Sequence, residues 1–179
     1  MSKNRISNHS YLLNKWITYN RRGYTWKEMT ILLGLAKQLD AAKLQYFRLR
    51  RVRNNMRKIT QHNYPRKMAT MTNYFIDLEF LFSSFHKIFD LIKLLSKESN
   101  KILSVHLTKY SKVFNNWEDA RNWVEHPEKK INQKGQKVPS DFGNMVGDYY
   151  SIAGIKYDVF NQSPIVLKEL EISFRKLFS

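Results

Sequence analysis

The 179-residue chain is 42% hydrophobic, which suffices for one domain with a buried core, and it carries a formal net charge of +16. It has no cysteine, which excludes disulfides, cysteine-ligated zinc and a cysteine nucleophile. It also lacks the ~18-residue apolar run of a membrane span and, in its first residues, the apolar core of a signal peptide, so we expect a soluble cytoplasmic protein without membrane contact.

The first predicted element is a long helix from Thr25 to about Ile59. Thr25 and Glu28 have the spacing of a capping box, in which each side chain accepts a hydrogen bond from the other residue's backbone N–H. Apolar residues follow at steps of three or four until Asn63-Tyr64-Pro65 interrupts the pattern. The sequence therefore predicts one continuous helix over this region.

The positive charge is concentrated in this N-terminal part of the chain. Residues 1–67 contain 16 Lys and Arg against two acids, whereas residues 68–179 contain 15 against 13. The densest stretch holds six basic residues, namely Arg48, Arg50, Arg51, Arg53, Arg57 and Lys58. Such a run attracts a phosphate backbone by releasing condensed counterions, without reading sequence. We predict that these six residues bind nucleic acid; the alternative is a solvated helix face that only promotes solubility.

Three more helices are predicted between residue 67 and Pro127. Residues 67–97 form the second, because phenylalanine and other apolar residues recur every three or four positions, and we interpret these phenylalanines as core. Residues 99–100 offer a cap for a third helix that ends near residue 115. Asn116 offers a cap for the fourth, with acids in its first turn where the helix dipole favours them.

The fourth helix carries the side chains best suited to chemistry, Arg121, Asn122 and His126. Arginine pairs a phosphate through two N–H groups, and histidine moves protons near neutral pH. At about 100° per residue, Arg121 and His126 lie about 140° apart around the helix. Pro127 follows directly and biases His126 away from helical torsions.

A purely structural interpretation of this helix stays open. Arg121 can pair with Glu118 or Glu125 at helical spacing, a surface pair worth ~0.3–0.5 kcal/mol, and His126 can interact with the helix dipole. The five histidines show no spacing typical of a zinc site, and there is no Gly-rich phosphate loop. We therefore expect neither a metal nor a cofactor.

The last part of the chain is predicted to hold a polar loop, a β-hairpin and a final helix. The loop contains Lys129 and Lys130, which are placed to guide RNA toward the motif. Alternating apolar residues predict strands over 144–152 and 155–159. Ser163-Pro164 predicts the start of the last helix, as an N-cap followed by a proline in the first turn.

These features together resemble the HEPN superfamily of helical proteins, whose signature is Arg-x4–6-His, often with a polar residue after the arginine. The resemblance covers residues 67–131 and rests on the aromatic-rich helix with Asp77-Leu78-Glu79-Phe80 and on Ala120-Arg121-Asn122-Trp123-Val124-Glu125-His126. Many members are metal-independent endoribonucleases, including toxins of toxin–antitoxin and phage-defence systems, and their active site forms where two protomers pair. Carried over to this chain, the resemblance implies Arg121, Asn122 and His126 as the catalytic residues.

We therefore predict a mainly α fold over residues 1–179, a HEPN-like helical bundle with a small C-terminal β-hairpin and a final helix. Within it, residues 1–65 form a basic N-terminal helical region, residues 66–131 the motif-bearing helical core, and residues 132–179 the loop, hairpin and last helix.

The predicted function is RNA cleavage by attack of a 2′-hydroxyl on its own 3′-phosphate. His126 serves as general acid and base, and Arg121 neutralises the phosphate. Asn122 orients either the His126 imidazole or a phosphate oxygen. Expected partners are RNA, with the DNA backbone as a second ligand, another copy of the chain in a homodimer, and an antitoxin or regulatory protein. The alternative is a non-catalytic nucleic-acid-binding or scaffold protein with the same fold.

Overall fold

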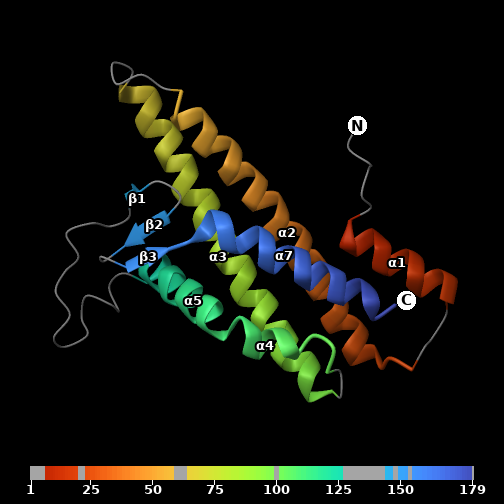
Figure 1. Cartoon of the computed structure of the whole chain (residues 1–179). Helices are drawn as coiled ribbons and strands as arrows, with labels where there is room; N and C mark the ends of the chain where they lie inside the picture. The colour runs from red at the N-terminus through yellow and green to blue at the C-terminus, as the bar shows by residue number, and fades with distance from the viewer. Residues whose placement is uncertain are drawn as a thin grey trace.

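The computed structural model describes residues 7–19, 23–58, 64–98, 101–126, 144–146, 149–152 and 155–178. Two long helices, α2 (Trp26–Met56) and α3 (Tyr64–Lys97), lie side by side and share the most extensive helix contact (Figure 1). Helices α1 (Asn8–Tyr19) and α7 (Val159–Lys176) pack on α2, and α5 (Ser111–Glu125) packs on α3. The mainly helical fold is thus confirmed. None of the described helices is long and apolar enough to cross a membrane.

The first two predicted helices are confirmed as α2 and α3. Helix α2 begins at the capping box, where Thr25 N–H donates to Glu28 Oε2 over 2.7 Å and Glu28 N–H donates to Thr25 Oγ1 over 3.2 Å. It ends at Met56, three residues before the predicted end. The phenylalanines of α3 are core as predicted: Phe82 and Phe85 are fully buried, and the ring centroid of Phe85 lies 4.0 Å from that of Trp117 in α5. Aromatic packing of this kind holds α5 on α3.

The predicted helix boundary at Asn116 is wrong. Between α3 and the motif lie a five-residue helix, α4 (Val105–Lys109), and a break at Tyr110, whose φ and ψ are −111° and 15°. Helix α5 then begins at Ser111 and passes through Asn116 without interruption. Its buried stripe is continuous across that point: Phe114, Trp117, Ala120 and Trp123. Burial of this stripe on α3 outweighs the local capping preference of asparagine. The predicted cap at residues 99–100 lies outside the described residues.

The C-terminal hairpin is confirmed as strands β2 (Tyr149–Ile152) and β3 (Ile155–Tyr157), and a third strand, β1 (Asn144–Val146), pairs antiparallel with β2. The sequence predicted residues 144–152 as one strand. The register pairs Val146 with Tyr149 and Asn144 with Ser151. The sheet packs on α3, where the rings of Tyr150 and Tyr157 contact Phe82.

The last helix, α7, has its N-cap at Asp158, five residues before the predicted N-cap Ser163. Asp158 caps it, since its carboxylate accepts from the backbone N–H of Asn161 over 3.2 Å. Pro164 therefore lies inside the helix, where it has no N–H to donate to the carbonyl of Phe160 one turn earlier. That carbonyl accepts a hydrogen bond of 3.3 Å from the hydroxyl of Tyr46 in α2. A tertiary contact thus replaces the helical hydrogen bond that proline removes.

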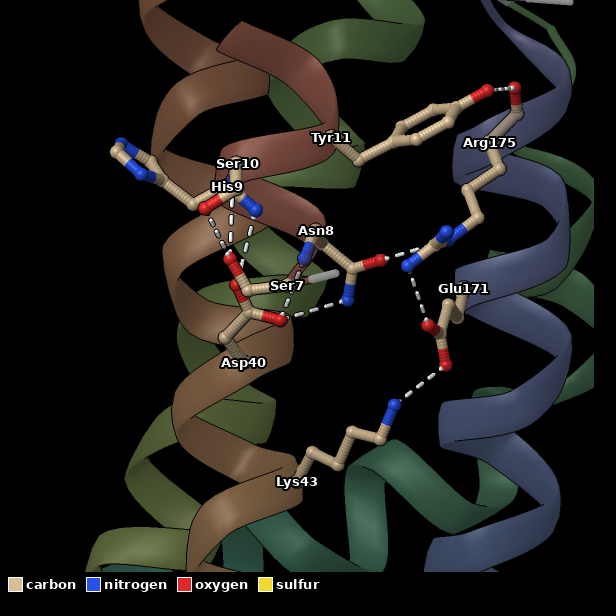
Figure 2. Close-up of polar contacts among 9 residues, drawn as sticks. All are labelled: Ser7, Asn8, His9, Ser10, Tyr11, Asp40, Lys43, Glu171 and Arg175. Carbon is tan, nitrogen blue, oxygen red and sulfur yellow. Dashed lines mark hydrogen bonds and ion pairs between the residues drawn. The ribbon is translucent and has the colours of Figure 1, made fainter. Parts of the chain in front are cut away.

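Helix α1 was not predicted from the sequence. Asp40, a residue of α2, accepts hydrogen bonds at the N-terminus of α1 (Figure 2). Asp40, in α2, accepts hydrogen bonds from the backbone N–H groups of Asn8 (2.9 Å) and His9 (3.0 Å) and from the side-chain amide of Asn8 (3.0 Å). Arg175 of α7 donates to the Asn8 side-chain oxygen over 3.3 Å and to Glu171 over 3.0 Å. The carboxylate of Asp40 therefore satisfies free N–H groups at the N-terminus of α1.

Changing Asp40 to alanine is expected to release α1 from α2. The variant loses the acceptor of three hydrogen bonds, and the cost should be about 1–2 kcal/mol by analogy with lost N-caps. Hydrogen exchange followed by mass spectrometry should show faster exchange over residues 8–19. Lys37→Ala, at an exposed position one turn away on α2, is the matched control. Unchanged protection of α1 in the Asp40 variant would contradict this role.

Candidate functional site

The six basic residues predicted to bind nucleic acid lie on α2 and in the turn after it, and Arg48 and Arg53 contact neighbouring helices. Arg48 Nε lies 3.1 Å from an oxygen of Asp77, which is buried in α3. Burial raises the pKa of the Asp77 carboxyl, and the charge of Arg48 opposes this shift. The guanidinium of Arg53 lies 4.2 Å from the ring centroid of Phe160 in α7. Arg48 and Arg53 therefore join α2 to α3 and α7.

The other four, Arg50, Arg51, Arg57 and Lys58, are exposed, as is Arg48. At about 100° per residue they fall within an arc of about 120° around α2, and Arg48 and Arg53 lie outside it on either side. We call these four residues the basic face. No acid occurs in residues 41–76, which hold nine Lys and Arg. The basic face thus lies at an end of the α2–α3 pair that has little negative charge of its own. Lys129 and Lys130 lie outside the described residues.

The predicted catalytic residues lie at the C-terminal half of α5. Arg121 makes an ion pair of 2.5 Å with Glu125, which also accepts a 2.5 Å hydrogen bond from the hydroxyl of Ser83 in α3. This pair is the structural alternative considered from the sequence. In a single chain, Glu125 thus occupies guanidinium N–H groups that a phosphate would need.

His126 is the residue at which α5 ends. Its φ and ψ are −138° and 53°, outside the helical range, and its backbone N–H donates to the Asn122 carbonyl over 3.0 Å. Its side chain is partly exposed, as is that of Asn122. The hydrogen bond from Arg121 holds the pKa of Glu125 below its usual value, and Ser83 and the charge of His126 act in the same direction. Arg121 is therefore the direct partner of this carboxylate.

Four further polar side chains, Ser83, His86, Asp90 and Glu118, lie around the Arg121–Glu125 pair, and of these only Glu118 was considered from the sequence, as a partner of Arg121 at helical spacing. In α3, His86 Nε2 lies 3.2 Å from Asp90 and His86 Nδ1 lies 3.9 Å from Glu118 of α5. Glu125, Glu118 and Asp90 all raise the pKa of Arg121, with the Glu125 hydrogen bond acting most strongly. We call Ser83, His86, Asp90, Glu118, Arg121 and Glu125 the α3–α5 polar cluster.

The α3–α5 polar cluster is more acidic than basic, since it holds three carboxylates against one arginine and one histidine. A free phosphodiester would therefore be repelled from it until Glu125 moved away from Arg121. Across the described part of the chain, no three His, Asp or Glu side chains are grouped so as to hold a metal ion. The helical spacing of residues 83, 86 and 90 on α3 was a signal for this cluster, but their partners lie on another helix.

His106 is buried, and its contacts are those of a packing residue. His106 Nε2 lies 2.8 Å from the hydroxyl of Ser173, so the contact joins α4 to α7, and the ring stacks on Tyr110. Burial lowers the pKa of His106. A neutral imidazole in this position packs two helices together, and we assign it no chemistry.

The chain matches no family model, and no significant match was found among curated proteins or solved structures. The resemblance to the HEPN superfamily therefore stays a prediction that rests on the residues of α3 and α5.

Proposed function

We propose that the protein binds the phosphate backbone of nucleic acid through the basic face of α2. The observation that carries this proposal is the exposure of four cations within one arc of a single helix, in a stretch without acids. Arg48 and Arg53 hold α2 against α3 and α7, so the helix presents the basic face from a fixed position. Charges held in this way attract polyanions without the cost of ordering a loop.

The proposed binding is independent of base sequence. Each phosphate that is neutralised releases about 0.7–0.9 counterion, so affinity should fall steeply with salt. Arginine suits this role because its planar fork matches two phosphate oxygens, and three of the four residues are arginine. RNA and the DNA backbone are both ligands under this proposal.

Neutralising Arg50 and Arg51 together tests the proposal. The Arg50→Gln, Arg51→Gln variant is expected to bind a fluorescein-labelled 20-nucleotide RNA or DNA about 5- to 10-fold more weakly than the native protein, measured by fluorescence anisotropy at low salt. Lys37→Gln, Lys168→Gln is the matched control, because it removes the same charge from exposed positions elsewhere and should change Kd less than twofold. Equal losses in both variants, or no binding by the native protein, would contradict the proposal.

A second candidate function is RNA cleavage by the HEPN-like motif. It is favoured by the position of Glu125, because an anionic group already pairs with Arg121, five residues before His126 in the motif. In the proposed reaction, the scissile phosphate takes the place of that carboxylate. His126 moves the protons of the 2′-hydroxyl and the leaving oxygen, Arg121 neutralises the phosphate, and Asn122 orients the imidazole. A role in toxin–antitoxin or phage-defence systems belongs to this second proposal.

Cleavage would involve a homodimer. Arg121 and His126 diverge around α5, so a two-fold related copy could bring Arg121 of one chain toward His126 of the other. The basic face would then collect RNA for the site. An antitoxin or regulatory protein is a further proposed partner.

A further inference from the structure

Phe47 is an exposed aromatic side chain on the basic face of α2. Phe47 is 53% exposed, although most of the other phenylalanines that the structure describes are buried. At about 100° per residue, Phe47 falls inside the arc that holds the four cations of the basic face. Asn54, which is also exposed, falls inside it too. The ring therefore lies among exposed cations and an amide, with the exposed side chain of Leu44 one turn before it on α2.

The ring of Phe47 also contacts an anchored aromatic neighbour. Phe47 contacts the ring of Tyr46 at a centroid distance of 5.8 Å, and the Tyr46 hydroxyl donates to the Phe160 carbonyl of α7 over 3.3 Å. Tyr46 is thus anchored between two helices and supports one side of Phe47. A supported ring loses little conformational freedom when a second flat group stacks on it.

We infer that the basic face takes unpaired bases, with one base of a single-stranded nucleic acid stacked on Phe47; this inference rests on the proposed function. Proteins that bind single strands without sequence preference combine cations along the phosphate backbone with aromatic rings. Any base can stack on such a ring, because every base has a π-face. Arg50 and Arg51 lie three and four residues after Phe47, so they reach the phosphates on either side of a stacked base.

A double helix does not use the Phe47 ring in this way. Its base faces are covered by stacking within the duplex, and only its phosphates and groove edges are available. With a duplex bound to the basic face, the Phe47 ring would either have no base to stack on or have to unstack a base pair. The charges of the basic face would attract both forms, but Phe47 should add affinity for single strands alone.

The test compares Phe47→Ala with the native protein on one fluorescein-labelled 20-nucleotide RNA, alone and annealed to its complement. By fluorescence anisotropy, Phe47→Ala is expected to bind the single strand at least about fivefold more weakly and the duplex within twofold of native. Phe47→Trp should restore single-strand binding. Phe80→Ala is the matched control, because Phe80 is 55% exposed on α3, outside the basic face, and its loss should change neither affinity.

Each result separates the two proposals. If Phe47→Ala weakens neither form, or both equally, while Arg50→Gln, Arg51→Gln weakens both, the stacking inference fails and backbone binding stands. If the arginine variant also has no effect, the proposed function fails. If Phe47→Ala changes the mass found by light scattering, a second copy covers the ring and the inference is overturned. Circular dichroism of each variant confirms that it is folded.

Discussion

Replacing Trp117 with alanine is expected to destabilise the fold by about 3–5 kcal/mol, the range for loss of a large buried aromatic side chain. Trp117 is 2% exposed, and its ring centroid lies 4.0 Å from that of Phe85 and 6.0 Å from that of Phe114. The surrounding rings belong to two helices, α3 and α5, and cannot collapse fully into the space left behind. Loss of this contact should therefore loosen α5 from α3.

Urea unfolding followed by circular dichroism measures this effect as a change in the midpoint. Val105→Ala is the control, because Val105 is 59% exposed and its change should cost less than about 0.5 kcal/mol. Since α5 carries Arg121, Asn122 and His126, the Trp117 variant should also alter any activity that depends on the motif. A loss below about 1 kcal/mol would show that the aromatic cluster does not fix α5 as the structure indicates.

If the chain cleaves RNA, His126→Ala is expected to lower the rate about 100- to 10,000-fold, the usual contribution of a general acid or base. Binding of RNA should stay within twofold of native, because His126 lies outside the basic face. Cleavage of a labelled RNA in EDTA, resolved on denaturing gels, measures the rate, and the products should carry 2′,3′-cyclic phosphates. His9→Ala, a change of a partly exposed histidine in α1, is the matched control. Equal cleavage by the His126 variant would eliminate the motif as the catalytic site.

Mixing two inactive variants tests whether two chains share the site. Arg121→Ala and His126→Ala are each expected to be inactive alone. In a mixed dimer, one of the two shared sites would hold a native Arg121 from one chain and a native His126 from the other, so activity should return. If each chain uses its own pair, both sites of the mixed dimer are defective. Continued inactivity after subunit exchange, shown by light scattering to yield dimers, would contradict the shared site.

The sequence predicted the helices whose signals are local. The capping box of Thr25 and Glu28 and the apolar periodicity of α2 and α3 are readable without tertiary information, because each residue pair lies within one or two turns. Helix α1 was missed although Ser7 accepts a hydrogen bond of 3.1 Å from the Ser10 N–H, a local cap. Much of what holds α1 comes from Asp40, 32 positions along the chain from Asn8, and no local pattern reveals it.

Misplaced boundaries have the same origin. Asn116 is a good N-cap in isolation, but it lies in α5 because Phe114 and Trp117 on either side are buried against α3. Pro164 looked like a helix start because its missing N–H is harmless there, yet Tyr46 supplies the lost hydrogen bond to Phe160 inside α7. In both places a long-range contact outweighs the preference of a single residue.

The sequence does not show which candidate site residues make tertiary contacts. The six basic residues form one group in the sequence, but in the structure Arg48 pairs with Asp77 of α3 and Arg53 lies over the ring of Phe160 in α7. The pairing of Arg121 with Glu125 could be considered from helical spacing. Its connection to Ser83, and the position of His86 and Asp90 near Arg121, depend on how α5 lies on α3.

The salt dependence of single-stranded RNA binding shows whether the basic face neutralises phosphates. If the four cations of the basic face neutralise phosphates, the logarithm of the association constant should fall with the logarithm of salt concentration with a slope of about −3, at ~0.7 per phosphate. Arg50→Gln, Arg51→Gln should reduce that slope to about half, and Lys37→Gln, Lys168→Gln should leave it unchanged. A slope near zero, or the same slope in the arginine variant as in the native protein, would contradict backbone binding by this face.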